Sequence, residues 1–349
     1  MKESDIMNKN IEIFNNFVMN NQNIEKMPVG LFYGKMGLSI YHYHQARLTD
    51  DKKHKEFANK LLNSVISHIG DDELPINLDS GLTGICWGII YLIENGFVEG
   101  SANYTLKELD DKIFKMLYIF LQRKDDISPD DFKNIVHCAL YFCKRLTDKR
   151  LSKNEQELFK QIIIKIINKV ESSFKTITIT EPFIFSPFDY IPFIYLSLIK
   201  KVYEFGFYTY KVEKVCDEWR DYLISSYPLL QTHKLLLSNA MKEVNKYCNL
   251  PHWDRHIDLL KRQTDMEYII SVEFRNRNIL LQDGLAGFYL FAKKNNPSII
   301  SNFEKPIKER LSTSELWSDF YQADDKEKMG FISLINGLSG VILAYQDIH

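Results

Sequence analysis

Ten residues near the end of the chain, NGLSGVILAY (Asn336–Tyr345), decide the fold. Two glycines three positions apart head an apolar run, although glycine weakens a helix by about 1 kcal/mol relative to alanine. The same G-x-x-G pattern opens three other runs, YGKMGLSIYHYHQ from Tyr33, SGLTGICWGIIYL from Ser80 and DGLAGFYLF from Asp283. Self-similarity of this kind indicates a repeat protein. The motif glycines, eight of the 15 in the chain, are Gly34, Gly37, Gly81, Gly84, Gly284, Gly287, Gly337 and Gly340.

The spacing of the copies predicts seven repeats. The first two copies are 47 residues apart and the last two are 53 apart. The 203 residues between Gly81 and Gly284 therefore leave room for three degenerate copies. Three apolar segments lie close to the required places, and they put Cys138, Tyr190 and Ala240 at the position of the first glycine.

The segments between the copies have helical periodicity with charged faces. In Lys153–Phe174, for example, Ile162, Ile163 and Ile166 lie on one face of a helix. Only FKTITIT (Phe174–Thr180) is a candidate strand. Amphipathic helices alternate with helices that are apolar nearly all round, which indicates an outer and an inner layer. An open array of such helix pairs would expose apolar surface at both ends, and closing it into a ring removes those ends. We therefore expect an all-α fold, an α/α toroid of about seven inner and seven outer helices, forming a single domain over residues 1–349.

The composition is that of a soluble globular protein. Of 349 residues, 45% are hydrophobic and 26% charged, and the net charge of -2 gives no reason to expect nucleic acid as a partner. No uncharged run reaches the roughly 20 residues of a membrane span, and the first residues do not form a secretory signal. Five scattered cysteines argue against a disulfide framework, so we expect a cytoplasmic protein.

Polar residues precede three of the glycine pairs. Ser80, Asp283 and Asn336 are good N-cap types, so we expect helices to begin at the following glycines. Parallel inner helices would gather their N-termini at one mouth, where accessible N–H groups could hold an anion, a carboxylate, a thiolate or a peptide. The alternative interpretation is that G-x-x-G is only a packing device that lets helices approach closely.

With these motifs the chain resembles the lanthionine synthetase C-like proteins, from about Leu31 to its last residue. The resemblance implies an α/α toroid whose inner helices begin with G-x-x-G. Cyclases of this family add a cysteine thiol to a dehydrated serine or threonine of a peptide, using zinc held by two cysteines and a histidine. Here Gln282 and Asp283 stand where the family has Cys-His, and Ser238 is assigned to the other cysteine position. Asp189 stands where the family often has a histidine, just before the first glycine of the fourth repeat.

The resemblance, with these departures, implies a zinc-free member that needs no cofactor. Such a protein would bind or help to modify a ribosomally made precursor peptide, alone or as the partner of a peptide-modifying enzyme. The candidate cavity rim and peptide-binding set is Tyr33, Asp79, Ser80, Gln282, Asp283 and Asn336, although several of these residues are also plausible helix caps.

The alternative function is a glycosidase-type hydrolase, since helical toroids also host such enzymes. It would need two cavity carboxylates about 5–10 Å apart. Asp79, Asp189 and Asp283 are the candidates because each lies near an expected inner-helix start.

Several other polar residues have weaker claims. His137 is a candidate catalytic residue beside Cys138, although buried inert cysteines are common in helical cores. Cys248, His252 and His256 recur every four residues, but Pro251 indicates a helix start that separates Cys248 from the histidines, which we expect at the surface. His42 and His44 fall on different faces of a helix and do not form a pair. The aromatic residues expected in the core are Tyr33, Tyr41, Trp87 and Tyr91, although a few near the mouth could instead form a peptide-binding wall.

Overall fold

A computed structural model describes residues 3–70, 74–123, 126–173 and 179–347. Every regular element in these ranges is helical, as expected from the sequence. The candidate strand Phe174–Thr180 falls outside the described residues except for its last two positions. The chain divides into two compact units. Unit 1 comprises Met1–Pro75, Asp79–Phe97 and Met266–His349, and unit 2 comprises Ile76–Leu78 and Val98–Asp265. The expected single domain stays a prediction.

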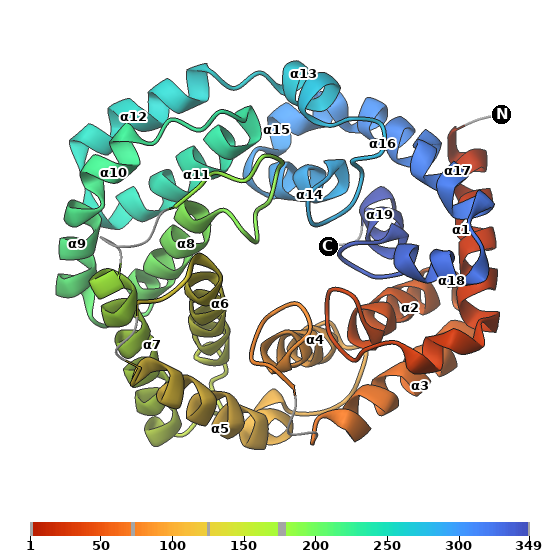
Figure 1. The fold of residues 1–349 in the computed structure, drawn as a ribbon, viewed down its shortest axis with the longest axis horizontal. Helices are drawn as coiled ribbons and strands as arrows, with labels where there is room; N and C mark the ends of the chain where they lie inside the picture. The colour runs from red at the N-terminus through yellow and green to blue at the C-terminus, as the bar shows by residue number, and fades with distance from the viewer. Residues whose placement is uncertain (1–2, 71–73, 124–125, 174–178, 348–349) are drawn as a thin grey trace. The chain divides into compact units, whose positions relative to one another are not determined.

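Unit 1 contains all four glycine-opened helices. These are α2 (Lys35–Thr49), α4 (Leu82–Glu94), α14 (Leu285–Asn295) and α19 (Leu338–Tyr345). Helix α2 packs against α4 and α19, and α14 packs against α19, so the last helix of the chain lies beside the first glycine-opened one (Figure 1).

Amphipathic helices pack on the glycine-opened helices of unit 1. Helix α3 (Lys52–His68) packs on α2, α16 (Glu304–Thr313) packs on α14 and α19, and α1 (Glu3–Asn20) packs on α16. This division follows from sequence, because α4 and α19 are apolar around most of their circumference whereas α3 buries only one stripe. The remaining elements are η1 (Gln22–Lys26), α13 (Met266–Tyr268), η2 (Ile269–Glu273), α15 (Pro297–Ile300), η3 (Ser301–Phe303), α17 (Glu315–Gln322), α18 (Asp325–Lys328) and η4 (Met329–Phe331).

Unit 2 repeats the arrangement without the glycine pairs. Its most buried helices are α6 (Pro129–Arg145), α8 (Ile191–Glu204) and α11 (Gln231–Cys248), and α8 packs against both α6 and α11. The other helices are α5 (Ala102–Leu121), α7 (Lys153–Ser173), α9 (Thr209–Glu218), α10 (Arg220–Ser225) and α12 (Pro251–Arg262). The seven buried helices of the two units match the expected number of inner helices.

The register predicted for the degenerate copies is right in one case and wrong in two. Tyr190 is the N-cap of α8, as its assignment to the glycine position requires. By contrast, α6 begins after Ser128 and α11 after Leu230, each ten residues before the predicted positions Cys138 and Ala240. A capping box of Ser128 and Asp131 fixes the start of α6. Without glycine, the apolar run alone does not mark where a helix begins.

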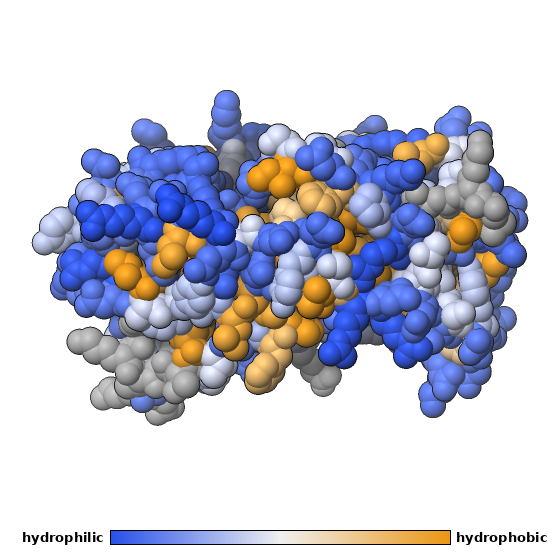
Figure 2. All heavy atoms as spheres, turned by 90° about the horizontal axis from the view of Figure 1, so that it is seen from above, coloured by the Kyte–Doolittle hydropathy of each residue, from blue (hydrophilic) through white to orange (hydrophobic). Residues whose placement is uncertain are grey.

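The face drawn in Figure 2 is mainly polar, and its apolar residues gather near the middle of the view. The most exposed large hydrophobic side chains are Phe183, Tyr104, Leu229 and Tyr210. Within the described ranges, no helix has the length and apolar character needed to cross a membrane.

Candidate functional site

The loops before the glycine-opened helices fold back and bond to the first helical residues. The backbone N–H of Lys35 donates to the carbonyl of Pro28 at 2.8 Å, and Leu285 donates in the same way to Asn278 at 2.8 Å. At the second copy, Leu82 donates to the residue seven positions earlier, at 2.8 Å. The expectation that these N–H groups are open to an anion is therefore wrong for these donors, because loop carbonyls already satisfy them.

The N-caps of these helices lie one residue later than expected. The N-cap positions are occupied by the glycines themselves, in extended conformation and with no side-chain cap hydrogen bond. Ser80, Asp283 and Asn336 each lie one residue before the cap. Because the returning loop caps the helix with its backbone, the side chain before the glycine is not needed for that purpose.

The second glycine of a G-x-x-G pair, where its surroundings are described, makes room for the same returning loop. At three of these positions, a Cβ atom would collide with the backbone carbonyl oxygen six residues earlier. The colliding pairs are Gly37 with Leu31, Gly287 with Leu281, and Gly340 with Leu334. The packing interpretation of G-x-x-G therefore has a specific cause, the close approach of loop and helix backbones.

A series of backbone hydrogen bonds, which we call the backbone relay, joins the four loops of unit 1. The N–H of Gln282 donates to the carbonyl of Ile335 at 3.1 Å, and Ile335 donates to Phe32 at 3.4 Å. Phe32 in turn donates to Asp79 at 2.9 Å. Each of these residues lies two positions before the first glycine of its copy. The relay therefore holds equivalent points of successive repeats side by side.

The relay brings together three side chains from the predicted rim set, Tyr33, Gln282 and Asn336, which we call the helix-start cluster. The Tyr33 hydroxyl donates to Gln282 Oε1 at 3.3 Å and accepts a hydrogen bond from Asn336 Nδ2. Tyr33 is 43% exposed, and both amide side chains are half-buried. The cluster thus presents an aromatic ring and amide groups at the start of three helices.

The other three predicted rim residues, Asp79, Ser80 and Asp283, are also half-buried and lie in the same loops of unit 1. The backbone of the second loop packs closely on the first, since a Cβ on Gly30 would collide with Ser80 and with the carbonyl of Asp79. This contact gives the residues of that loop a structural role in addition to any functional one.

Asp189, the third candidate carboxylate of the hydrolase hypothesis, belongs to unit 2 and is fully engaged. Its carboxylate accepts from Ser186 Oγ at 2.6 Å and from Lys133 Nζ at 2.9 Å. Burial alone would raise the pKa of Asp189, but the bonds from Ser186 and Lys133 outweigh it and lower the pKa. A carboxylate held ionised in this way is a poor general acid, so Asp189 does not suit that one of the two carboxylate roles of a glycosidase.

His137 and Cys138 lie inside α6, two turns beyond its start, rather than at a cap position. Burial lowers the pKa of His137 to about 4. The Cys138 thiol is fully buried and donates to the carbonyl of Ile76 at 3.5 Å. A buried thiol of this kind is structural, so the nucleophile hypothesis has no support here.

Two of the three residues proposed at zinc-ligand positions, Ser238 and Gln282, carry side chains that bind zinc weakly. Ser238 lies eight residues into α11, where its buried hydroxyl donates to the carbonyl of Leu235 at 3.1 Å. The Gln282 amide oxygen is occupied by Tyr33. Amide oxygens and hydroxyls are weak partners for Zn²⁺, which prefers nitrogen and sulfur. In the part of the chain that the structure describes, no three His, Cys, Asp or Glu side chains gather as metal ligands do.

Three histidines have surroundings that the sequence did not predict. His256 is buried, at 6% exposure, and not at the surface as expected, because it lies on the inner face of α12. His42 does form a pair, but with His54 of α3, their Nδ1 atoms being 2.8 Å apart. His44 instead bonds to the Tyr91 hydroxyl at 2.7 Å. Sequence periodicity places a residue on a helix face but does not identify the residue opposite it, so these contacts were not predictable.

Comparison with known proteins supports the fold. No family model and no curated protein matches this sequence. Among solved structures, the chain is similar to one described as "Nisin cyclase", with a TM-score of 0.67 and 13% sequence identity, over 99% of this chain and 94% of that one. Together with the helical repeats, this likeness confirms the expected fold class. The chain has the all-α toroid fold of the lanthionine synthetase C-like proteins.

Proposed function

We propose that this protein acts in peptide modification as a zinc-free lanthionine synthetase C-like protein. It binds a ribosomally made precursor peptide, alone or together with a modifying enzyme, at the helix-start cluster. The observation that carries the proposal is the position of Tyr33, Gln282 and Asn336, which converge at the starts of three glycine-opened helices. Nisin cyclase, which shares the fold, acts on a peptide according to its name.

The chemistry of the cluster suits a peptide backbone. Tyr33 offers an exposed aromatic ring, which contributes large contact area at low entropic cost. Its hydroxyl fixes one end of each neighbouring amide, so Gln282 Nε2 and Asn336 Oδ1 remain to pair with peptide C=O and N–H groups. A donor and an acceptor beside an aromatic surface recognise an extended chain without requiring a charge.

The proposal excludes zinc-dependent cyclisation at this site. The cyclase reaction of the family depends on a metal-stabilised thiolate, and Gln282 and Ser238 supply an amide and a hydroxyl where the family has thiolates. Without the metal, the fold can still bind a peptide and hold it for another enzyme.

The first test measures peptide binding. A fluorescein-labelled peptide containing dehydroalanine and cysteine should bind the full chain, seen as a rise in fluorescence polarisation. Tyr33→Phe removes the hydroxyl that orients both amides and should weaken binding roughly tenfold, equivalent to about 1.4 kcal/mol. Tyr104→Phe, at a tyrosine that is 89% exposed on α5, serves as the matched control and should bind normally. Equal affinity of the two variants would remove the cluster from the binding site.

The second test addresses the metal. Elemental analysis of the purified protein, before and after incubation with zinc and desalting, should find far less than one zinc per chain. The same peptide should keep its free thiol during incubation with the protein. Stoichiometric zinc, or zinc-dependent loss of the thiol, contradicts the zinc-free proposal but leaves peptide binding to be judged by the first test.

A further inference from the structure

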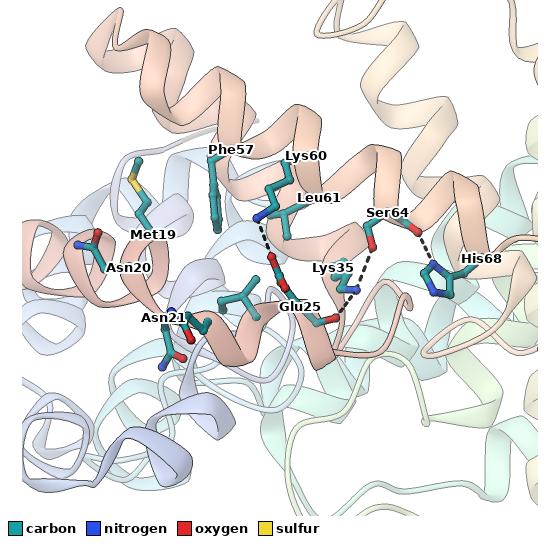
Figure 3. A pocket seen from close by; sticks show the side chains of 12 residues that line it. Met19, Asn20, Asn21, Glu25, Lys35, Phe57, Lys60, Leu61, Ser64 and His68 are labelled. Carbon is teal, nitrogen blue, oxygen red and sulfur yellow. Dashed lines mark hydrogen bonds and ion pairs between the residues drawn. The ribbon is translucent and has the colours of Figure 1, made fainter.

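A separate pocket of about 390 Å³ lies in unit 1 between the N-terminal segment and α3 (Figure 3). One face of α3 forms one side of it, where Phe57, Leu61, Ser64 and His68 follow one another at intervals of about one turn. The end of α1, the short helix η1 and the first residue of α2 form the rest. The volume is within the range of small-molecule sites, and none of the lining residues belongs to the helix-start cluster.

Ser64 and Lys35 meet at this pocket in a direct hydrogen bond. Lys35 Nζ lies 2.9 Å from Ser64 Oγ, as a dashed line in Figure 3 marks, and 2.8 Å from the backbone carbonyl oxygen of Glu25. Lys35 is only 5% exposed, whereas Ser64 is half-buried. Two oxygens therefore hold the amine in place, and the hydroxyl is the more accessible member of the pair.

The Ser64 hydroxyl differs from other serine hydroxyls on the helices of unit 1. Ser39 and Ser67 donate to the backbone carbonyl three residues earlier, at 2.7 and 2.9 Å, a local bond that helical serines often make. Within the described ranges, Ser64 Oγ makes no such bond and has Lys35 Nζ as its partner. Its proton is therefore not committed to the helix backbone and can pass to a base.

Lys35 has surroundings that favour its neutral form. Burial lowers the pKa of Lys35, and this effect outweighs the opposing influence of the Glu25 carboxylate. That carboxylate pairs with Lys60 at 2.9 Å, and over the described residues no carboxylate lies within ion-pair distance of Lys35. A desolvated lysine can serve as a general base, as it does in serine–lysine catalytic pairs.

We propose that Ser64 and Lys35 form a catalytic pair that hydrolyses a small carboxylic ester with an apolar acyl group. The acyl group packs on Phe57 and Leu61, which precede Ser64 on the same face of α3 and are removed from water by it. An ester suits the pair better than an amide, because an alcohol is a better leaving group than an amine. This activity does not depend on peptide binding at the helix-start cluster.

The reaction needs water as its only co-reactant. Neutral Lys35 Nζ takes the Ser64 proton while Oγ bonds to the ester carbon, and the ammonium so formed lies beside the negative tetrahedral adduct. Collapse of the adduct breaks the bond to the alcohol oxygen, which receives the proton from Lys35 and leaves as the alcohol. Lys35 then takes a proton from a water molecule that attacks the acyl group, and this step frees the carboxylic acid and restores Ser64.

The first experiment measures hydrolysis of p-nitrophenyl butyrate by the full chain. Release of p-nitrophenol should be saturable in the ester, and Ser64→Ala, which removes a single oxygen, should lower the rate at least roughly tenfold. Ser67→Ala, at an exposed serine of α3 outside the pocket, is the matched control and should keep the rate. Equal rates for Ser64→Ala and Ser67→Ala would overturn the proposal.

The second experiment identifies the nucleophile and its base. An alkyl fluorophosphonate should phosphonylate Ser64 with loss of fluoride, and peptide mass spectrometry locates the adduct. Lys35→Met should slow this labelling at least roughly tenfold. Because Lys35 is buried, the pH dependence of labelling in the unchanged protein gives a test that needs no substitution. The rate should rise with pH, with a midpoint below the pKa of an exposed lysine, about 10.4. An adduct at another residue, no adduct, or a rate that stays constant between about pH 7 and 10 would refute the pair.

Discussion

The motif glycines show how one residue type can be required for space rather than for flexibility. Gly34, Gly284 and Gly337 all have extended backbones that other residues could adopt. What they lack is room for a Cβ, because the preceding loop passes directly over them. Their positions in sequence therefore identify places of contact between loop and helix backbones.

Gly37→Ala tests this explanation. The added methyl group would meet the Leu31 carbonyl and the Leu334 side chain, so it should lower the free energy of unfolding by about 1–3 kcal/mol, as overpacking typically does. Gly330→Ala is the control, since nothing lies within 4 Å of a Cβ there. Urea unfolding followed by circular dichroism measures both. Equal stability of the two variants would show that the loop yields without cost.

The buried histidine pair gives a second consequence at this scale. His42 is fully buried between α2 and α3, and its Nδ1 contacts Nδ1 of His54, so the two cannot both carry that proton. Burial, assisted by the neighbouring His54, holds the pKa of His42 well below its usual range. Burial also lowers the pKa of His54, against the opposing effect of Asp51.

These pKa shifts predict a loss of stability in mild acid. Because the pKa of each histidine is lower in the folded than in the unfolded state, unfolding takes up protons. The contribution of the pair is therefore complete above about pH 6.5 and declines as the pH falls towards the folded-state values. His42→Phe should make urea stability less dependent on pH between about 6.5 and 4. A slope identical to that of the unchanged protein would contradict this assignment.

At the scale of whole elements, α9 and α11 bring two cysteines together. Cys216 Sγ and Cys248 Sγ are 3.7 Å apart, and the Tyr203 hydroxyl lies 3.0 Å from Cys248 Sγ. The hydrogen bond between Cys248 and Cys216 lowers the pKa of the Cys248 thiol, burial opposes this, and the bond with Tyr203 lowers it further. Cys248 is the more exposed of the two and therefore the more reactive.

Hydrogen peroxide is expected to join these helices. The Cys248 thiolate attacks one peroxide oxygen and becomes a sulfenic acid, and the Cys216 thiol then displaces water to form the disulfide. Two thiols and one peroxide thus give one disulfide and two waters. Mass spectrometry should find a Cys216–Cys248 cross-link that disappears in Cys248→Ser and persists in Cys86→Ser. Persistence of both free thiols after mild oxidation would show that the two helices cannot approach further.

Elements also differ in how well sequence locates them. The starts of α2, α4, α14 and α19 follow directly from glycine pairs. In α2, α14 and α19, a Cβ on either glycine would collide with the backbone of the preceding loop. In α6 and α11 the start depends on a capping box or on loop geometry, and the apolar run used for prediction continues well past it. The expected N-cap positions are off by one residue for a related reason, since the first helical N–H groups donate to loop carbonyls seven residues earlier, and no residue type marks such backbone bonds in the sequence.

At the scale of the molecule, unit 1 is assembled from both ends of the chain. The backbone relay connects Gln282 to Ile335, and then Ile335 to Phe32, which is about 300 residues earlier in sequence. Helix α19 also packs on α2 and α14. Formation of unit 1 therefore requires residues that are synthesised at opposite ends of the sequence.

Hydrogen exchange can test the relay directly. The amides of Phe32 and Gln282 lie in loops but donate to backbone carbonyls, so we expect them to exchange at rates similar to those of helical amides. The amide of Phe183, a residue that is 96% exposed in another loop, provides the comparison and should exchange rapidly. Rapid exchange of Phe32 and Gln282 would show that the relay opens readily in solution.

The fold class was predictable from the repeats, whereas the site was predictable only in part. Tyr33, Gln282 and Asn336 were expected near one another because each precedes a motif glycine, and the structure brings them into contact. The pocket between η1 and α3 gave no such signal. Its residues come from helices without a shared motif, and Lys35 is distinctive only because of what surrounds it after folding.

The backbone relay has a consequence for how such a protein can change. Its hydrogen bonds use main-chain atoms, which every residue except proline provides in full. Side chains at these same positions can therefore be exchanged without dismantling the scaffold that presents them. Main-chain atoms of these residues thus hold the fold while their side chains determine its chemistry, so one backbone framework can present different side-chain clusters.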